Sequence, residues 1–257
     1  MRDYMQKNSR SFLKLPSPVI GRKLRDVDLV VIPCGSTEQH GPHLPVSTDV
    51  LIVEGLLERA ITKLEESSKS PKLFVLPALC FSCSHEHLSF PGTLSLRRST
   101  FENLVKDIVF SIVRYGTKRI LIVNGHGGNK SLEAVARDIR WETDTIVYYY
   151  DLGQSQAFRK HQAGMDMHAG YCETSLMLAL YPELVTHEAI PSFDITRSQW
   201  QEEQLLQLHA PWKTEEISLS GVIGEAQKAS AEFGEEIISY FTEEFSLLVT
   251  QFCSHGK

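Results

Sequence analysis

Several side chains that could bind a metal lie close together in the stretch GSTEQHGPHLPVSTD, which runs from Gly35 to Asp49. Glu38 and His40 are two residues apart, so their side chains point the same way if the chain is locally extended. A carboxylate beside an imidazole suits Zn, Mn or Fe(II) better than Ca or Mg, which prefer oxygen ligands. The alternative is a solvated polar loop in which Asp49, or its neighbour Thr48, caps the next helix.

A further histidine lies in the glycine-rich stretch NGHGGN, residues 124–129. The glycines allow the backbone to turn sharply around His126, so that its ring can face a site. A dinucleotide-binding GxGxxG motif would need glycine at position 130, where the chain has Lys130. Since a lone histidine in such a turn is more often structural than a ligand, His126 becomes a metal candidate only together with other residues.

The stretch DMHAGYCETS, residues 166–175, places His168 ahead of an expected helix that carries Glu173. Residues five apart in one helix lie on different faces, so the two side chains converge only if His168 precedes the first turn. The apolar sequence after Glu173 indicates a buried helix, and a buried carboxylate requires a charged partner. That partner is a metal cation or, alternatively, an arginine or lysine.

His85 and His87 form a rival pair, because a spacing of two could bind a metal from one face of a strand. We expect His87 to line the site and His85 to face solvent. The nearby CxxC of Cys80 and Cys83 has no second pair, which is typical of two reduced thiols and not of a zinc or redox site.

The elements that must position these residues are predicted as alternating strands and helices. Short apolar runs predict strands over 29–32, 73–76, 120–123 and 146–150. Helical spacing predicts helices over 49–66, 99–116, 129–142, 171–182 and 225–249, the second with a capping box from Ser99 to Glu102. This alternation predicts a three-layer α/β/α fold with a mostly parallel central sheet. In such sheets ligands bind beyond the carboxyl ends of the strands, where the loops carrying Glu38 and His126 begin.

Length and composition set the wider expectations. The 257 residues are compatible with a single α/β domain, 1–257. A formal net charge of -6 gives no electrostatic basis for binding nucleic acid or a membrane. With no signal-peptide pattern and no apolar run approaching about 20 residues, we expect a cytoplasmic protein. Residues 191–221 are irregular and could form a lid or an oligomer contact.

Five stretches, in the same order along the chain, resemble the creatininase family: GSTEQHGPHLPVSTD, SFPGTLSL, NGHGGN, HAGYCETS and SGVIGEAQKASAEFGEE. The resemblance implies a three-layer α/β fold, a homo-oligomer, commonly a hexamer, and two divalent ions. It also implies that Glu38, His40, Asp49 and His126 bind these ions, with Asp49 shared between them, whereas His43 has no ligand role.

The sequence departs from creatininase itself at two points. Gly128 stands where that enzyme has a metal-binding carboxylate, and Glu173 is the nearest residue able to replace it. No tryptophan lies just ahead of His168, where creatininase has one that contacts substrate, which argues against creatinine as the substrate. The NGHGGN form is more similar to relatives that hydrolyse formamido-pyrimidine nucleotides, the mycofactocin precursor peptide or cyclic keto-inositols.

We therefore expect a metal-dependent amidohydrolase that cleaves a C–N bond, other than an ordinary peptide bond, in a small cyclic amide or formamide. Two divalent ions, Zn first with Mn or Fe possible at one site, would share a hydroxide. His168 and Glu173 are the expected catalytic residues, with His168 passing a proton to the leaving nitrogen, and His87, Asn124 and Asn129 are expected around the ligands or substrate. Alternatives are ring opening of a keto-inositol, a mycofactocin-type precursor peptidase and a metal-stabilised scaffold without turnover.

Overall fold

The computed structural model describes residues 12, 15–66, 70–161, 166–192 and 212–254. Its sheet consists of β1 (Leu29–Cys34), β2 (Leu73–Val75), β3 (Arg119–Asn124) and β4 (Ile146–Asp151), all parallel, in the order β2–β1–β3–β4. The helices are α2 (Ser17–Asp26), α3 (Thr48–Glu65), α4 (Arg98–Val113), α5 (Leu132–Glu142), α6 (Gln156–His161), α7 (Tyr171–Leu180), α9 (Thr214–Ile217) and α10 (Ala231–Ser254).

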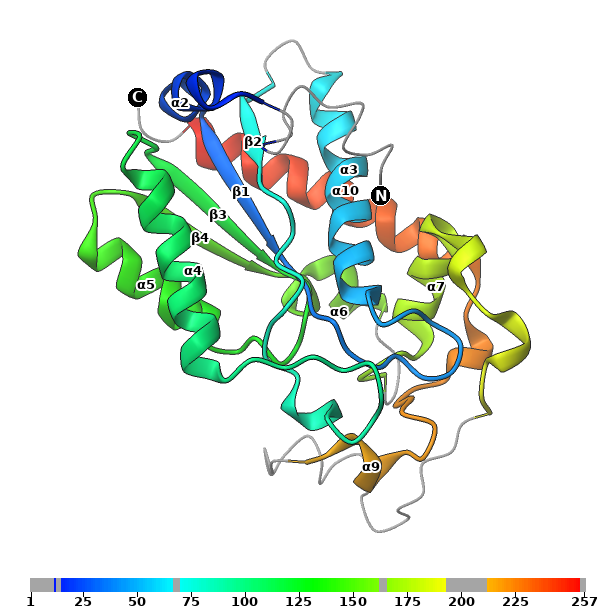
Figure 1. Cartoon of the computed structure of the whole chain (residues 1–257). Coiled ribbons are helices and arrows are strands. Elements are labelled where there is room, and N and C mark those ends of the chain that lie inside the picture. The colour runs from blue at the N-terminus through cyan, green and yellow to red at the C-terminus, as the bar shows by residue number, and fades with distance from the viewer. Residues whose placement is uncertain (1–11, 13–14, 67–69, 162–165, 193–211, 255–257) are drawn as a thin grey trace.

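Helices cover both faces of the sheet (Figure 1). Successive strand residues point to opposite faces, so Val31 packs in one core cluster and Val30 and Ile32 pack in the other. The first cluster also contains residues of α3, α7 and α10, whereas the second contains residues of α2, α4 and α5. The expected three-layer α/β/α fold with a parallel sheet is therefore confirmed.

The order of the strands places the loops after β1 and β3 next to each other at the carboxyl ends of the strands. From β1 the chain passes through α3 to β2 at the edge, and then returns through α4, on the opposite face, to β3 on the other side of β1. The ends of β1 and β3 lie side by side, with Cys34 paired to Asn124. The loops that leave them diverge to the two faces, which creates the crevice where open α/β sheets bind ligands.

The predicted strands and helices are present with bounds shifted by a few residues, but the capping box is wrong. Helix α4 begins at Arg98, so Ser99 already lies inside the first turn and cannot cap it. Glu102 instead pairs with Arg98, at 3.1 Å. The sequence pattern did not predict α2, because its helical spacing extends over only ten residues.

Two further expectations concern less regular segments. Of residues 191–221, the part from 193 to 211 lies outside the described residues, and the part from 212 includes α9. None of the described helices is both long enough and apolar enough to cross a membrane.

Candidate metal centre

The loop after β1 folds back on itself and buries its ionisable side chains. The N–H of Glu38 donates to the carbonyl of Val46 at 2.9 Å, which closes the loop. Glu38 and His40 are 0% exposed and Asp49, in the first turn of α3, is 2% exposed. Neither Asp49 nor Thr48 caps α3, because this helix already begins at Thr48 and its N-cap residue makes no side-chain hydrogen bond. The loop is therefore not a solvated one.

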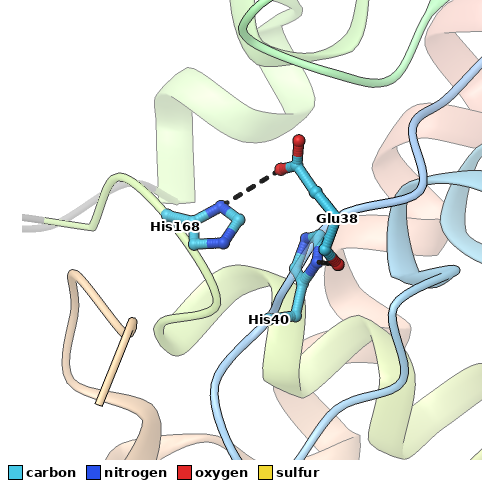
Figure 2. A group of neighbouring side chains, drawn as sticks. All are labelled: Glu38, His40 and His168. Carbon is cyan, nitrogen blue, oxygen red and sulfur yellow. Dashed lines mark hydrogen bonds and ion pairs between the residues drawn. The ribbon is translucent and has the colours of Figure 1, made fainter. Parts of the chain in front are cut away.

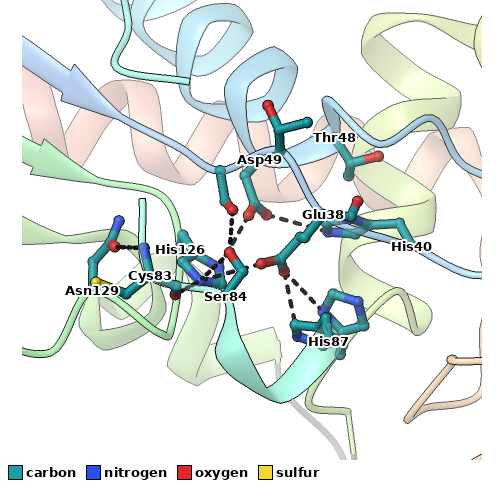
Figure 3. A network of polar contacts seen from close by, with 12 residues as sticks. Glu38, His40, Thr48, Asp49, Cys83, Ser84, His87, His126 and Asn129 are labelled. Carbon is teal, nitrogen blue, oxygen red and sulfur yellow. Dashed lines mark hydrogen bonds and ion pairs between the residues drawn. The ribbon is translucent and has the colours of Figure 1, made fainter. Parts of the chain in front are cut away.

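Asp49 lies between two imidazoles (Figure 3). Its Oδ1 is 3.2 Å from Nε2 of His40, and its Oδ2 is 3.1 Å from Nδ1 of His126. Glu38 Oε2 lies 3.3 Å from Nε2 of His126. Potential ligand atoms thus form three groups, and two of them share Asp49: one with Glu38 and His126, and one with His40 and Glu173. The third group consists of Glu38, His40 and His168.

The hydrogen bonds of the two imidazoles leave one nitrogen of each ring directed at Asp49. A carbonyl oxygen can only accept a hydrogen bond, so the ring nitrogen beside it carries the proton. Nδ1 of His40 lies 3.1 Å from the carbonyl of Glu38, and Nε2 of His126 lies 2.7 Å from the carbonyl of Cys83. The opposite nitrogens, Nε2 of His40 and Nδ1 of His126, face Asp49 and would present lone pairs to a metal once they lose their protons, as metal-binding histidines do.

The cluster leaves buried polar atoms without hydrogen bonds. Both oxygens of Glu38, Nε2 of His40 and Oδ2 of Asp49 lack hydrogen-bond partners among the described residues. Such atoms are costly to bury unless a cation binds them. The separations of 3.2 and 3.1 Å between Asp49 and the two imidazoles are close to the roughly 3.3 Å between neighbouring ligands of a tetrahedral ion with bonds of about 2.0–2.1 Å. These residues fit a divalent metal.

The charges in the metal-free cluster depend strongly on one another. Burial raises the pKa of Glu38 to about 7, although His126 opposes this shift. Burial would lower the pKa values of the two imidazoles, but neighbouring carboxylates raise that of His40 to about 9 and that of His126 to about 10. Burial alone would raise the pKa of Asp49, but His40 and His126 hold it well below its usual range. Protons on the imidazoles therefore occupy the position that a divalent cation would take.

His168 and Glu173 converge on this cluster from the start of α7. His168 precedes the helix, as expected, and its Nδ1 faces Oε1 of Glu38 at 3.6 Å (Figure 2). Burial and the nearby His40 lower the pKa of His168 well below its usual value. Glu173 is 25% exposed and lies 3.8 Å from Nε2 of His40, which is its ion-pair partner among the described residues. Burial also raises the pKa of Glu173 to about 7.

Comparison with known proteins identifies the family. The family described as creatinine amidohydrolase matches residues 14–249. The chain belongs to the creatininase family. A mycofactocin precursor peptide peptidase from Mycobacterium ulcerans is 31% identical over 218 residues, which are 84% of this chain and 82% of the relative. A creatinine amidohydrolase from Pseudomonas putida is 27% identical over 239 residues, 82% of this chain and 84% of the relative.

Solved structures support the same fold. A structure of creatinine amidohydrolase (creatininase) covers 97% of this chain and 100% of its own, with a TM-score of 0.78 and 24% identity. Other creatininase structures are described as an Mn form and as a Zn–Zn type. The family and the ligand cluster together support a metal-dependent hydrolase.

The backbone at Gly128 leaves no space for a side chain. A Cβ at this position would overlap the carbonyl oxygen of Cys83 and Nε2 of His126. The Cys83 carbonyl thus takes the space of a side chain and holds the imidazole of His126. Glu173, from a different element, supplies the third carboxylate near the cluster.

The remaining predicted residues lie at different distances from the ligands. His87 is buried and its Nε2 lies 3.5 Å from Oε1 of Glu38, whereas His85 is exposed and contacts Ser95. Burial, with His40 and His126, lowers the pKa of His87 to about 3. His43 is buried, and its Nε2 contacts the hydroxyl of Thr174 at 2.8 Å. Cys80 and Cys83 are free thiols.

Asn124 and Asn129 fix the backbone around His126 and do not touch its ring. The side chain of Asn124 bonds to the carbonyl and N–H of His126, at 2.9 and 3.3 Å. The side-chain Oδ1 of Asn129 accepts the N–H of Cys83 at 3.3 Å, and Cys83 is the residue whose carbonyl holds the ring. Both residues thus position His126 through the backbone.

A cavity of about 160 Å³ opens beside the cluster. Sequence reasoning missed two of its carboxylates, Asp151 and Asp166. Asp151 follows the run of 146–150 at the carboxyl end of β4, a position that could have indicated it. Asp166 accepts the N–H groups of Tyr171 and Cys172, at 2.7 and 2.8 Å, and so caps α7.

Proposed function

We propose that the protein hydrolyses the C–N bond of a small cyclic amide or formamide with two divalent ions. One ion would bind to Glu38, Asp49 and His126, and the other to His40, Asp49 and Glu173. The observation that carries this proposal is the position of Asp49, which directs one oxygen to each of two imidazoles in a buried cluster. Zn is our first expectation, with Mn or Fe at one site.

Two divalent ions would supply Lewis-acid polarisation of the carbonyl and a nucleophile at neutral pH. His168 has its Nε2 proton bound to the carbonyl of Gln39, at 2.7 Å, so its Nδ1 is free to accept a proton. Since His168 and Glu173 both line the cavity, they can contact a bound substrate. His168 would transfer the proton to the leaving nitrogen.

The cavity supports a small substrate without phosphate groups. Its volume of about 160 Å³ is below the roughly 300–1,000 Å³ of pockets for drug-sized ligands. Its described lining includes Asp151, Asp166 and Glu173 but no lysine or arginine. The described lining therefore offers a phosphate group no cationic side chain other than its histidines, which favours amides without such a group.

A second candidate is cleavage of an amide bond in a peptide. This candidate rests on the 31% identity to the mycofactocin precursor peptide peptidase. A 3-dehydro-scyllo-inosose hydrolase from Thermotoga maritima is 25% identical, but the alignment covers only 55% of that relative. Ring opening of a keto-inositol therefore has weaker support.

The test is a hydrolysis assay of purified protein against cyclic amides, formamides, peptides and a keto-inositol. The metal content is measured in the same samples before and after treatment with a chelator. We expect amide hydrolysis that disappears with the metal and returns when Zn or Mn is added. Full activity in a sample shown to be free of metal would contradict the proposal.

A variant separates catalysis from a metal-stabilised scaffold. Glu38→Gln keeps the shape of the side chain but removes its charge. If the site is catalytic, we expect activity to fall much more than thermal stability. If the wild type hydrolyses none of these substrates and Glu38→Gln only lowers the thermal stability, the scaffold is favoured.

The family resemblance also leads us to propose a homo-oligomer, with a hexamer as the first expectation. Exposed apolar side chains near the ligand loops support this proposal, namely Val46, Phe81, Leu88 and Leu94. Burial of such a surface between copies would remove it from water. Light scattering coupled to size-exclusion chromatography measures the number of copies, and a monomer at all concentrations would contradict the proposal.

A further inference from the structure

Two histidines that look equivalent in the sequence face the same carboxylate oxygen. Nε2 of His87 and Nδ1 of His168 lie 3.5 and 3.6 Å from Oε1 of Glu38. Their ring centroids are only 4.1 Å apart. Whether each ring presents a proton or a lone pair to Glu38 depends on the partner of its other nitrogen.

Nδ1 of His87 contacts the Thr214 hydroxyl, which can donate or accept, and the side-chain amide of Gln39, whose direction is fixed. The oxygen of this amide accepts the N–H of Gly41 at 2.9 Å, and its nitrogen donates to the carbonyl of Gly221 at 3.0 Å. These two bonds fix which end of the amide is nitrogen. That nitrogen lies 2.9 Å from Nδ1 of His87, which must therefore accept a hydrogen bond and leave the proton on Nε2.

Gly221 is adapted to this arrangement. It has a positive φ of +85°, and a Cβ on it would overlap the amide of Gln39. Only glycine allows the chain to come this close and still present its carbonyl to the amide. The orientation of the Gln39 side chain is thus held by Gly41 in its own loop and by the distant Gly221.

The partner of His168 is the backbone of the same glutamine. Nε2 of His168 lies 2.7 Å from the carbonyl oxygen of Gln39, which can only accept. The proton is therefore on Nε2, and Nδ1 presents its lone pair toward Glu38. Toward Glu38, His87 therefore presents an N–H and His168 presents a lone pair. Gln39 sets the first through its side chain and the second through its backbone carbonyl.

We propose that Gln39 is a positioning residue that sets the tautomers of both histidines. His87 directs an N–H toward Oε1 of Glu38 at 3.5 Å, so it is a favourable electrostatic neighbour of this carboxylate and cannot bind a metal without losing its proton. Oε2 of Glu38 is then left for the group that contains His126. His168 keeps a lone pair for proton transfer, a consequence that rests on the proposed function, whereas the tautomers do not.

Isosteric variants separate these effects. Gln39→Glu replaces the donating amide with a carboxylate that can only accept, so the proton of His87 should move to Nδ1. The backbone carbonyl of residue 39 is unchanged, so His168 should keep its proton on Nε2 and serves as an internal control. His87→Gln keeps an N–H near the position of Nε2, whereas His87→Asn places its amide near Nδ1.

The experiment is ¹⁵N NMR of the imidazoles in the full-length, metal-free chain, together with titration by Zn²⁺. We expect the Nε2–H tautomer for both histidines in the wild type, and a change at His87 alone in Gln39→Glu. Zn²⁺ affinity should fall by about 10- to 100-fold in Gln39→Glu and His87→Asn, as for other partners of metal ligands. His87→Gln should retain most of the wild-type affinity.

Two outcomes would overturn the proposal: a proton on Nδ1 of His87 in the wild type, or an unchanged tautomer in folded Gln39→Glu. If Gln39→Glu does not fold, the tautomer of His87 is measured in Thr214→Val instead. The hydroxyl of Thr214 also lies 2.7 Å from Nδ1 of His87. Loss of this hydroxyl should leave the tautomer unchanged, and a change would assign control to Thr214 instead. None of these measurements needs a substrate. A failure of the proposed function can therefore be told apart from a failure of this proposal.

Discussion

Asp49 is shared by two groups of potential ligand atoms. His40 reaches it from the loop after β1, and His126 reaches it from the loop after β3. Because each oxygen faces a different imidazole, one carboxylate can serve two cations. The effect of losing it should therefore exceed the loss of a single ligand.

The first prediction concerns Asp49→Asn, which preserves shape but removes the charge and one accepting oxygen. We expect loss of bound metal and a fall in kcat/KM of at least about 100-fold, since even residues behind the ligands cost 10- to 100-fold. Metal analysis and kinetics measure both effects. Asp107→Asn, on the exposed side of α4, is the matched control. Full occupancy of both sites in Asp49→Asn would refute the shared role.

The second prediction tests the steric explanation for Gly128. In Gly128→Ala the new Cβ would meet the Cys83 carbonyl, whereas a Cβ at Gly127 would have no atom within 4 Å. We expect Gly128→Ala to lose about 1–3 kcal/mol of stability, which lowers the melting temperature of a chain of this size by several degrees. Gly127→Ala should lose much less. Equal melting temperatures for the two variants, measured by calorimetry, would disprove the explanation.

At the scale of elements, the first turn of α7 positions Glu173. Ala169 has a positive φ of +51°, which is unusual for a residue with a side chain, and its N–H donates to Oε2 of Glu173 at 2.6 Å. Asp166 caps the helix by accepting two backbone N–H groups. The turn therefore places a carboxylate where the glycine-rich loop cannot supply one.

The third prediction follows from this turn. Asp166→Ala should lower the free energy of unfolding by about 0.5–2 kcal/mol, as loss of a helix cap does. It should also weaken the ion bound by Glu173 more than the ion bound by His126. Titration with Zn²⁺ would separate the two binding steps, and Asp144→Ala, on an exposed surface residue, is the control. Equal weakening of both steps would mean that the turn does not act through Glu173.

At the scale of the whole molecule, the site depends on the order of the strands. The crossover from β2 to β3 brings the ends of β1 and β3 together, and each loop then contributes part of the ligand cluster. The cluster is buried at this edge, so its charges are poorly solvated and depend on one another. Protonation and metal binding should therefore change the stability of the fold.

The fourth prediction is a pH dependence of the metal-free protein. The pKa values of His40 and His126, about 9 and 10, lie above their ordinary value of 6.5. Their contribution to stability is thus complete below pH 6.5 and is lost as pH rises through 9 to 10. We expect the free energy of unfolding of the metal-free protein to fall between pH 7 and pH 9.

Zinc affinity should rise over the same interval, because binding displaces the two imidazole protons. Denaturant titrations at several pH values, with and without Zn²⁺, measure both trends. His40→Gln should flatten the dependence of the metal-free protein. A metal-free protein that becomes more stable toward pH 9 would contradict the assignment of these protons.

Periodicity and residue type in the sequence alone determined the fold and most of the candidate ligands. Alternation of apolar strands with helices is a local property, and the metal-binding types of Glu38, His40 and Asp49 are visible in one short stretch. The position of these loops after strands also predicted that they would meet at one edge of the sheet. The capping box failed because helix boundaries depend on the backbone conformation of a few residues.

Only the tertiary structure decided which atoms face one another. It showed that the Cys83 carbonyl fills the space of a side chain at Gly128, that Glu173 approaches His40, and that Gln39 contacts both His87 and His168. The bond from Gln39 to Gly221 spans 182 positions in the sequence. Local sequence patterns carry no information about such contacts, because they arise only when packing brings distant segments together.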